Sequence, residues 1–185
     1  MLARHGEPAL SRKVWLSADE YRAFWSAYEG VGLMPGQTPP AELARVVETC
    51  QILLSSTRPR SIESARHLAG ARVFESLEFL IEAPLPPPNL PRAVRLPPSV
   101  WGFLARFWWW FFNHHQGEES RAAAEARADR AAALLIGHAE RGEDVAVLAH
   151  GFFNHLIGRA LRDRGWRLTK SEGYKYWSMR RWEQP

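Results

Sequence analysis

The stretch Asp144-Val145-Ala146-Val147-Leu148-Ala149-His150-Gly151 is the clearest strand signal in the chain. Its five consecutive apolar residues are typical of a strand that a parallel sheet buries on both faces. The glycine permits a tight turn, and the residues that follow, to about Arg164, have a helical pattern. This transition predicts an α/β protein with a histidine at the carboxyl end of a buried strand.

Two further apolar runs lead into residues that suit chemistry. The run Leu2-Ala3-Arg4-His5-Gly6 again ends in a histidine and a glycine, and Ile52-Leu53-Leu54 leads into a loop that carries Arg58 and Arg60. If the three runs are neighbouring parallel strands, two imidazoles and at least two guanidiniums meet in one crevice. Such a cluster repels itself when empty and suits a dianionic phosphoryl group.

Helical patterns separate these runs. Ser17-Ala18-Asp19-Glu20 forms a capping box ahead of aromatic residues at helical spacing. The patterns predict helices over 17–30, 40–50, 61–68, 120–141 and 151–164, a short strand within 72–77 and a terminal strand within 174–182. We therefore expect a three-layer α/β/α sandwich around a mostly parallel sheet.

The segment between these elements is rich in proline and then in aromatic residues. Seven prolines between positions 83 and 98 exclude a regular element there. Residues 101–112 are strongly aromatic, and we expect core plus a lid over the cleft rather than an apolar substrate wall or a docking patch. We predict one domain, 1–185, with an irregular, lid-like insertion at about 83–116.

Length and composition exclude several classes of protein. The chain has 185 residues, a net charge of +4 and a single cysteine, Cys50, so no intrachain disulfide can form. The most apolar stretch, 100–112, is shorter than the roughly 20 residues of a spanning helix. We expect a soluble, cytoplasmic protein with no nucleic-acid partner, because the positive charge is mild and the basic aromatic tail matches no nucleic-acid motif.

The three runs together resemble the histidine phosphatase (phosphoglycerate mutase-like) superfamily. Arg4-His5-Gly6-Glu7 matches the family's Arg-His-Gly signature, residues 56–65 resemble its Ser-x-x-x-Arg-Ala-x-x-Thr-Ala motif, and Val145–Gly151 resembles the strand with the second histidine. The motifs stand in the family's order, and the resemblance covers essentially the whole chain. Ser61, Ser64 and Ala149 depart from the usual residues.

The resemblance implies a set of roles. His5 would be the nucleophile that forms a phosphohistidine. Arg4, Arg60 and His150, the last as an imidazolium, would hold the phosphoryl oxygens, so no metal or other cofactor is required. Arg58 and Asn154 are candidates for further phosphate contacts, with surface or capping roles as the alternative.

The resemblance also implies an acid that protonates the leaving group. Our candidate is Glu82, for which we expect an apolar setting that raises the pKa of the carboxyl, with Glu78 and Glu75 as rivals. The residues around Glu82 do not reproduce the family's Leu-x-Glu-x-x-(Phe/Tyr)-Gly context.

Other histidines are expected to have no catalytic role. His114 and His115 are adjacent, and His150 and His155 are five apart on a helix, so neither pair shares a face. We therefore predict no metal site. Only three residues precede Arg4, so we expect either a clipped first strand or a start codon assigned too far downstream.

The sequence therefore predicts a phosphatase that acts on a phosphorylated small molecule or a phosphoprotein. A mutase of the same chemistry and a silent phosphate-binding module are the alternatives. Exposed tryptophans would favour a homodimer.

Overall fold

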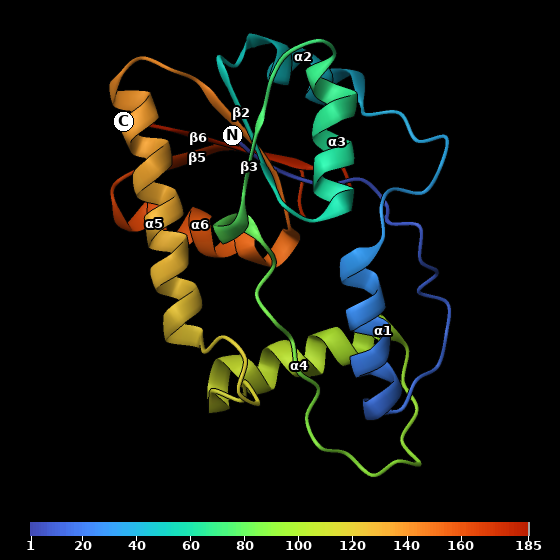
Figure 1. Ribbon diagram of the computed structural model, residues 1–185. Coiled ribbons are helices and arrows are strands. Elements are labelled where there is room, and N and C mark those ends of the chain that lie inside the picture. The colour runs from blue at the N-terminus through green and yellow to red at the C-terminus, as the bar shows by residue number, and fades with distance from the viewer. Residues whose placement is uncertain (185) are drawn as a thin grey trace.

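The computed structural model describes residues 1–184. A central sheet in the strand order β3-β2-β4-β1-β6-β5 runs through it (Figure 1). The strands are β1 (Leu2–Arg4), β2 (Ile52–Ser56), β3 (Glu75–Leu77), β4 (Val145–Ala149), β5 (Arg167–Ser171) and β6 (Met179–Glu183). The first four are parallel, whereas β6 is antiparallel to β1 and to β5. The expectation of a mostly parallel sheet is confirmed.

Helices cover both faces of the sheet and extend past one edge. They are α1 (Ala18–Gly30), α2 (Ala41–Thr49), α3 (Pro59–Ala69), α4 (Pro98–Phe112), α5 (Arg121–Glu140) and α6 (Gly151–Asp163), with a 3₁₀ turn η1 (Glu78–Leu80). One face packs on α5 and α6 and the other on α2 and α3, which gives the expected three layers (Figure 1).

Strand alternation explains why β4 could be read so clearly from the sequence. Val145, Val147 and Ala149 pack towards α5 and α6, whereas Ala146 and Leu148 pack towards α2 and α3. Every residue of β4 is buried, because β1 and β2 flank it and helices cover both faces. A strand in this position needs apolar side chains throughout.

The aromatic segment forms a helix, α4, that lies with α1 beyond the sheet (Figure 1). Its inner face contributes Trp101 and Trp109, both fully buried, and Trp101 stacks near Tyr21 of α1. Its outer face carries exposed phenylalanines: Phe103, Phe107, Phe111 and Phe112. Core packing therefore accounts for one face of this segment only. The prolines of 83–97 form no helix or strand, as expected, and a lid function for the segment stays a prediction.

One expectation near the carboxyl end of the chain needs correction. The expected terminal strand at 174–182 is instead a turn at 173–177 followed by β6, and the preceding strand β5 was not predicted. The exposed, polar residues of β5 give an edge strand little hydrophobic signal. At the other end, β1 has only three residues.

Candidate active site

The carboxyl ends of three parallel strands bring distant residues together. His5 follows β1, His150 follows β4, and Arg60 lies in the first turn of α3, after β2. The rings of His5 and His150 meet edge to face with their centroids 5.1 Å apart. The two imidazoles that the sequence placed at strand ends therefore share one site, 145 positions apart in the chain.

Arg60 joins the two histidines. Its side chain is fully buried, and its Nε donates a hydrogen bond of 3.2 Å to Nε2 of His5. Its Nη2 donates over 3.4 Å to Nδ1 of His150 and over 2.8 Å to a carboxylate oxygen of Glu29, while Nη1 donates to the Tyr28 carbonyl. The guanidinium thus lies between the two rings.

These contacts determine the protonation of both rings. An arginine can only donate, so Nε2 of His5 and Nδ1 of His150 must be acceptors. The other ring nitrogens then carry the protons. Nδ1 of His5 donates to the Gly6 carbonyl over 2.7 Å, and Nε2 of His150 donates to Oγ of Ser56 over 2.8 Å. Both imidazoles are neutral in this arrangement.

The electrostatic surroundings agree with neutral rings. Burial, and then the positive charge of Arg60, lower the pKa of His5 and of His150 well below the usual 6.5. Arg4 lowers both pKa values further. Desolvation and neighbouring guanidiniums thus disfavour a further positive charge on His150, and the imidazolium expected when this residue holds a phosphoryl group stays a prediction.

Arg4 lies at the entrance of this cluster. Because side chains alternate along a strand, Arg4 lies on the same face of β1 as Leu2, which is the face towards α6. Its side chain passes close to Gly151, where an added Cβ would lie 3.4 Å from Cδ of Arg4. Its guanidinium lies over the ring of Tyr176, 4.3 Å from the centroid, and Nη1 donates to the Tyr174 carbonyl. The turn between β5 and β6 thus holds Arg4 beside the histidines.

That turn also explains the glycine after His5. The indole of Trp177 fills the space beside Gly6, where a Cβ would lie 2.4 Å from Cζ2 of Trp177. The Trp177 backbone N–H donates to the His5 carbonyl, so the turn is attached to the peptide of His5 itself.

Glu29 is a site residue that sequence analysis missed. It lies near the end of α1 and forms ion pairs with both Arg58 and Arg60. Arg58, a candidate phosphate contact, is therefore engaged by a carboxylate in the unliganded protein. No motif marks Glu29; only the packing of α1 against the start of α3 shows its role.

Glu82 is held at the start of the helix that follows His150. Its carboxylate accepts hydrogen bonds from the backbone N–H groups of Phe153, over 2.7 Å, and Phe152, over 3.2 Å. The expected apolar setting is wrong: the carboxylate lies in the first turn of α6, where N–H groups point outward. Since His150 is the N-cap of that helix, Glu82 and His150 lie at the same helix end.

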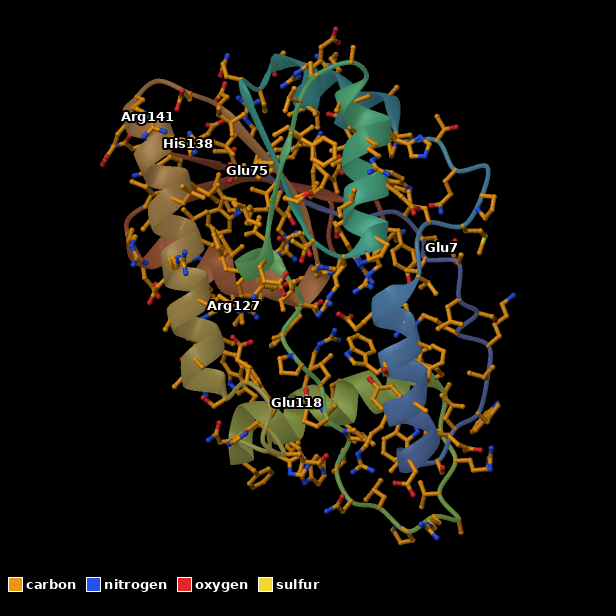
Figure 2. The ribbon with its side chains drawn as sticks, viewed as in Figure 1. Glu7, Glu75, Glu118, Arg127, His138 and Arg141 are labelled. Carbon is orange, nitrogen blue, oxygen red and sulfur yellow. The ribbon has the colours of Figure 1, made fainter. Side chains whose placement is uncertain are left out.

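The rival acids and Asn154 have other surroundings. Glu78 accepts a hydrogen bond from Oγ1 of Thr57 over 2.6 Å. Glu75 is exposed at the start of β3, the far end of that strand from the site (Figure 2). Asn154 donates to the Ala3 carbonyl over 2.9 Å, so it connects α6 to β1 rather than facing the cluster as a phosphate contact would.

Two cavities adjoin the cluster, and Glu82 lines both. One, of about 530 Å³, lies among α1, the proline-rich segment and the start of α5, with Trp25, Arg58 and Glu118 on its wall. The other, of about 380 Å³, includes Arg4 and Gly151. His5 and His150 are only 2% and 1% exposed, and neither of them lines either cavity.

Neither a metal cluster nor a membrane span is found in the part of the chain that the structure describes. Within residues 1–184 no three His, Cys, Asp or Glu side chains are grouped as ligands of a metal ion. None of the helices there is both long and apolar enough to cross a membrane.

Comparison with solved structures identifies proteins of similar fold. YhfR from Bacillus stearothermophilus superposes with a TM-score of 0.60 at 20% identity, over 88% of this chain and 78% of that one. The open reading frame Rv3214 from Mycobacterium tuberculosis gives 0.51 at 26% identity, over 88% and 77%. Phosphoserine phosphatase from Entamoeba histolytica, in complex with 3-phosphoglyceric acid, gives 0.50 at 14%, over 100% and 95%.

These structural neighbours are histidine phosphatase, phosphoglycerate mutase-like proteins. The family resemblance and the fold class inferred from the sequence are therefore confirmed. No family model matches the chain, and no curated protein matches it.

Proposed function

We propose that this chain, which has the phosphoglycerate mutase-like fold, is a metal-independent phosphatase that hydrolyses phosphomonoesters through a phosphohistidine on His5. The observation that carries the proposal is the pair of buried imidazoles 5.1 Å apart with Arg60 between them. The presence of phosphatases among the structural neighbours supports the same class of activity.

The tautomer of His5 fits a nucleophile. Its Nδ1–H is fixed on the Gly6 carbonyl, so the lone pair of Nε2 is available once Arg60 turns its Nε–H towards a phosphoryl oxygen. Nε2 then attacks phosphorus in line, an N–P bond forms, and the ester P–O bond breaks. A low pKa keeps this nitrogen unprotonated at neutral pH.

Permanent positive charge stabilises the transferring group. Arg4 and Arg60 carry guanidiniums, and such positively charged groups stabilise the charge on the equatorial oxygens. A bound dianion would also favour the imidazolium of His150, because it offsets the repulsion that Arg60 exerts. His150 would then donate from Nδ1 as well as from Nε2.

Glu82 is the group we assign to the leaving oxygen. It lies on the wall of both cavities and at the helix end that His150 caps. In its protonated form it would transfer a proton to the departing alkoxide. The resulting carboxylate would then take a proton from water as that water attacks phosphohistidine, which releases phosphate and restores the free imidazole.

The proposal includes the remaining properties inferred from the sequence. The substrate is a phosphorylated small molecule or a phosphoprotein, and the proline-rich and aromatic segment, 83–116, acts as a lid over it. A cytoplasmic location and a homodimer also stay predictions.

Steady-state hydrolysis of two ester types tests the chemistry. His5→Ala should abolish hydrolysis of 4-nitrophenyl phosphate, and His67→Ala, at an exposed position of α3, should not. Wild-type protein quenched in mid-turnover should gain the mass of one phosphoryl group, and the His5→Ala variant should not. Full activity in a folded His5→Ala protein would overturn the assignment.

The role of Glu82 has its own test. Glu82→Gln should reduce kcat for alkyl phosphates by about 10²- to 10⁴-fold, the usual contribution of a general acid, and reduce it far less for the activated aryl ester. Glu75→Gln, at the exposed start of β3, is the matched control, and Glu78→Gln tests the nearer rival. Equal losses for both ester types would exclude proton donation by Glu82.

The same measurements separate the alternatives. A silent binding module would bind orthophosphate without turning over either ester. A mutase would return the phosphoryl group to a second hydroxyl of an added phosphorylated acceptor faster than to water.

A further inference from the structure

The outer face of α4 gathers exposed apolar side chains. Within residues 1–184 ten large hydrophobic side chains are exposed, and five of them lie on this one helix of 15 residues: Val100, Phe103, Phe107, Phe111 and Phe112. Single exposed hydrophobic residues are normal on a protein surface, whereas a cluster of this kind marks a surface that binds a partner. Because α4 lies at the end of the molecule opposite α2, this face is open to a large partner (Figure 1).

The four phenylalanines form one continuous surface, which we call the aromatic face. Phe103, Phe107 and Phe111 follow one another at intervals of four residues, which places them along one side of the helix. The ring centroid of Phe107 lies 4.8 Å from that of Phe111 and 6.2 Å from that of Phe112. Phe107 is 40% exposed and the other three are each 66% exposed. The four rings therefore expose on the order of 400–500 Å², if a phenylalanine has about 200 Å² to bury.

A tryptophan from another segment extends the aromatic face. Trp15 is 65% exposed. It is held beside the start of α4, because Leu16 forms a backbone bridge with Leu96 and the Leu16 carbonyl accepts a hydrogen bond of 2.7 Å from the indole of Trp101. Tryptophan and phenylalanine are typical of the apolar side of helices that lie in the surface of a bilayer.

The surroundings of the aromatic face are positively charged. Segments 12–16 and 83–116, which carry Trp15 and α4, together contain five cationic residues and no aspartate or glutamate. Asp19 and Glu20, at the start of α1, pair with two of these cations and offset only those two charges. An excess of positive charge therefore borders the aromatic face. The five cationic residues are Arg12, Lys13, Arg92, Arg95 and Arg106.

A second copy of the chain fits this face less well than a bilayer does. A stable dimer of standard size buries about 800 Å² on each partner, and the aromatic face offers about half of that area. Two copies joined through the same face would also bring their positive borders together, and like charges repel. The surface of an anionic bilayer attracts these charges and accepts the rings without a complementary protein surface.

We propose that the aromatic face and Trp15 dock this protein on the surface of a bilayer that contains anionic phospholipids. The rings enter the boundary between headgroups and acyl chains, and the cations of segments 12–16 and 83–116 lie against the lipid headgroups. This binding does not depend on the proposed phosphatase activity. Its tests use no catalytic readout, so either proposal can fail without the other.

Cosedimentation with vesicles tests the proposal. Vesicles of phosphatidylcholine alone and vesicles with about 30% phosphatidylserine are compared at about 0.1 M salt. We expect the partition coefficient to be at least about tenfold higher for the anionic vesicles and to fall as salt is raised to about 1 M, because salt screens the attraction between the cations and the headgroups. Equal binding to both kinds of vesicle, or binding to neither, would overturn the proposal.

Variants of the aromatic face locate the binding surface. Phe103→Ser/Phe111→Ser should weaken binding to anionic vesicles by roughly a hundredfold, because the burial of each ring contributes about a factor of ten or more. Met34→Ser/Val73→Ser removes two exposed apolar side chains elsewhere and is the matched control, which should bind as the wild type does. Equal losses in the two double variants would refute a role for the aromatic face.

Charge variants test the second part of the proposal without changing any apolar contact. Lys13→Gln/Arg92→Gln should weaken binding to anionic vesicles by about fivefold for each charge removed. Arg45→Gln/Arg66→Gln removes two exposed cations from α2 and α3, at the opposite end of the molecule, and should have little effect (Figure 1). If both pairs of substitutions weaken binding equally, net charge alone governs binding and the docking surface is wrong.

Sedimentation velocity without vesicles tests the competing occupant. We expect that Phe103→Ser/Phe111→Ser leaves the oligomeric state of the protein unchanged. A wild-type dimer that this substitution converts to a monomer would assign the aromatic face to a second copy of the chain, and the proposal of a bilayer would be overturned.

Discussion

Acidification should destabilise the protein through the two buried histidines. Burial and guanidiniums hold the pKa values of His5 and His150 well below 6.5 in the folded state, whereas unfolding restores the ordinary value. As the pH falls below 6.5, the unfolded chain therefore binds more protons than the folded chain, and the free energy of unfolding decreases. Above about pH 7.5 both histidines are neutral in the folded and in the unfolded state, so they no longer make the free energy of unfolding depend on pH.

The size of this effect has a thermodynamic ceiling. The unfolded imidazole titrates around pH 6.5, so each histidine that protonates only on unfolding contributes about 1.4 kcal/mol over the whole window from pH 7.5 to pH 5.5, and the pair contributes about 2.8 kcal/mol. Carboxylates with lowered pKa values, such as Glu20 and Glu42, titrate below this window. His155, whose pKa is also lowered, adds in the same direction.

Urea denaturation at pH 7.5, 6.5 and 5.5 measures this dependence. The His5→Gln/His150→Gln double variant should lose less stability on acidification than the wild type, by about 2.8 kcal/mol at most, and His150→Gln alone should show about half of that. His67→Gln, at an exposed position, should behave as the wild type. If the free energy of unfolding fell equally on acidification in the wild type and in folded variants lacking these histidines, the lowered pKa values would be refuted.

Two further predictions concern positioning and packing. Arg127, labelled in Figure 2, donates to the Ile81 carbonyl, one residue before Glu82, over 2.7 Å. Arg127→Met should therefore lower kcat for alkyl phosphates by roughly tenfold and lower kcat for activated aryl phosphates less. Loss of the fold would lower both values alike. Gly158→Ala should lower the free energy of unfolding by about 1–3 kcal/mol, because a Cβ there would lie 2.6 Å from the Trp182 indole. Gly137→Ala, where the nearest atom would be Nη1 of Arg141 at an ordinary contact distance of 3.8 Å, should raise the free energy of unfolding by up to about 1 kcal/mol; changes of the opposite sign in thermal melts would refute the packing argument.

Residues fixed by backbone topology could be predicted from the sequence. His5 and His150 each follow an apolar run, and parallel strands bring such positions to one edge of the sheet. The same topology brings Arg58 and Arg60, which follow β2, to that edge, but the choice of Arg60 came from the family resemblance. Local pattern and general topology were sufficient for the two histidines.

Residues contributed by the packing of other segments could not be predicted. Glu29 reaches the site only because α1 ends beside α3. The aromatic composition of α4 indicates burial without indicating which face is buried. The setting of Glu82 likewise depends on a tertiary contact, with backbone groups 70 positions away in the chain.

The electrostatics of the site meet two requirements with one arrangement. A histidine nucleophile must be unprotonated, and a phosphoryl dianion must be attracted; both conditions favour permanent positive charge in a buried place. Arg60 and Arg4 supply that charge, and their effect on His5 and His150 is visible in the lowered pKa values. When a dianion enters, its charge opposes that of the guanidiniums, so the affinity of His150 for a proton rises when a third donor is useful. Under the proposed function, binding of a dianionic substrate would therefore raise the pKa of His150 and favour its imidazolium.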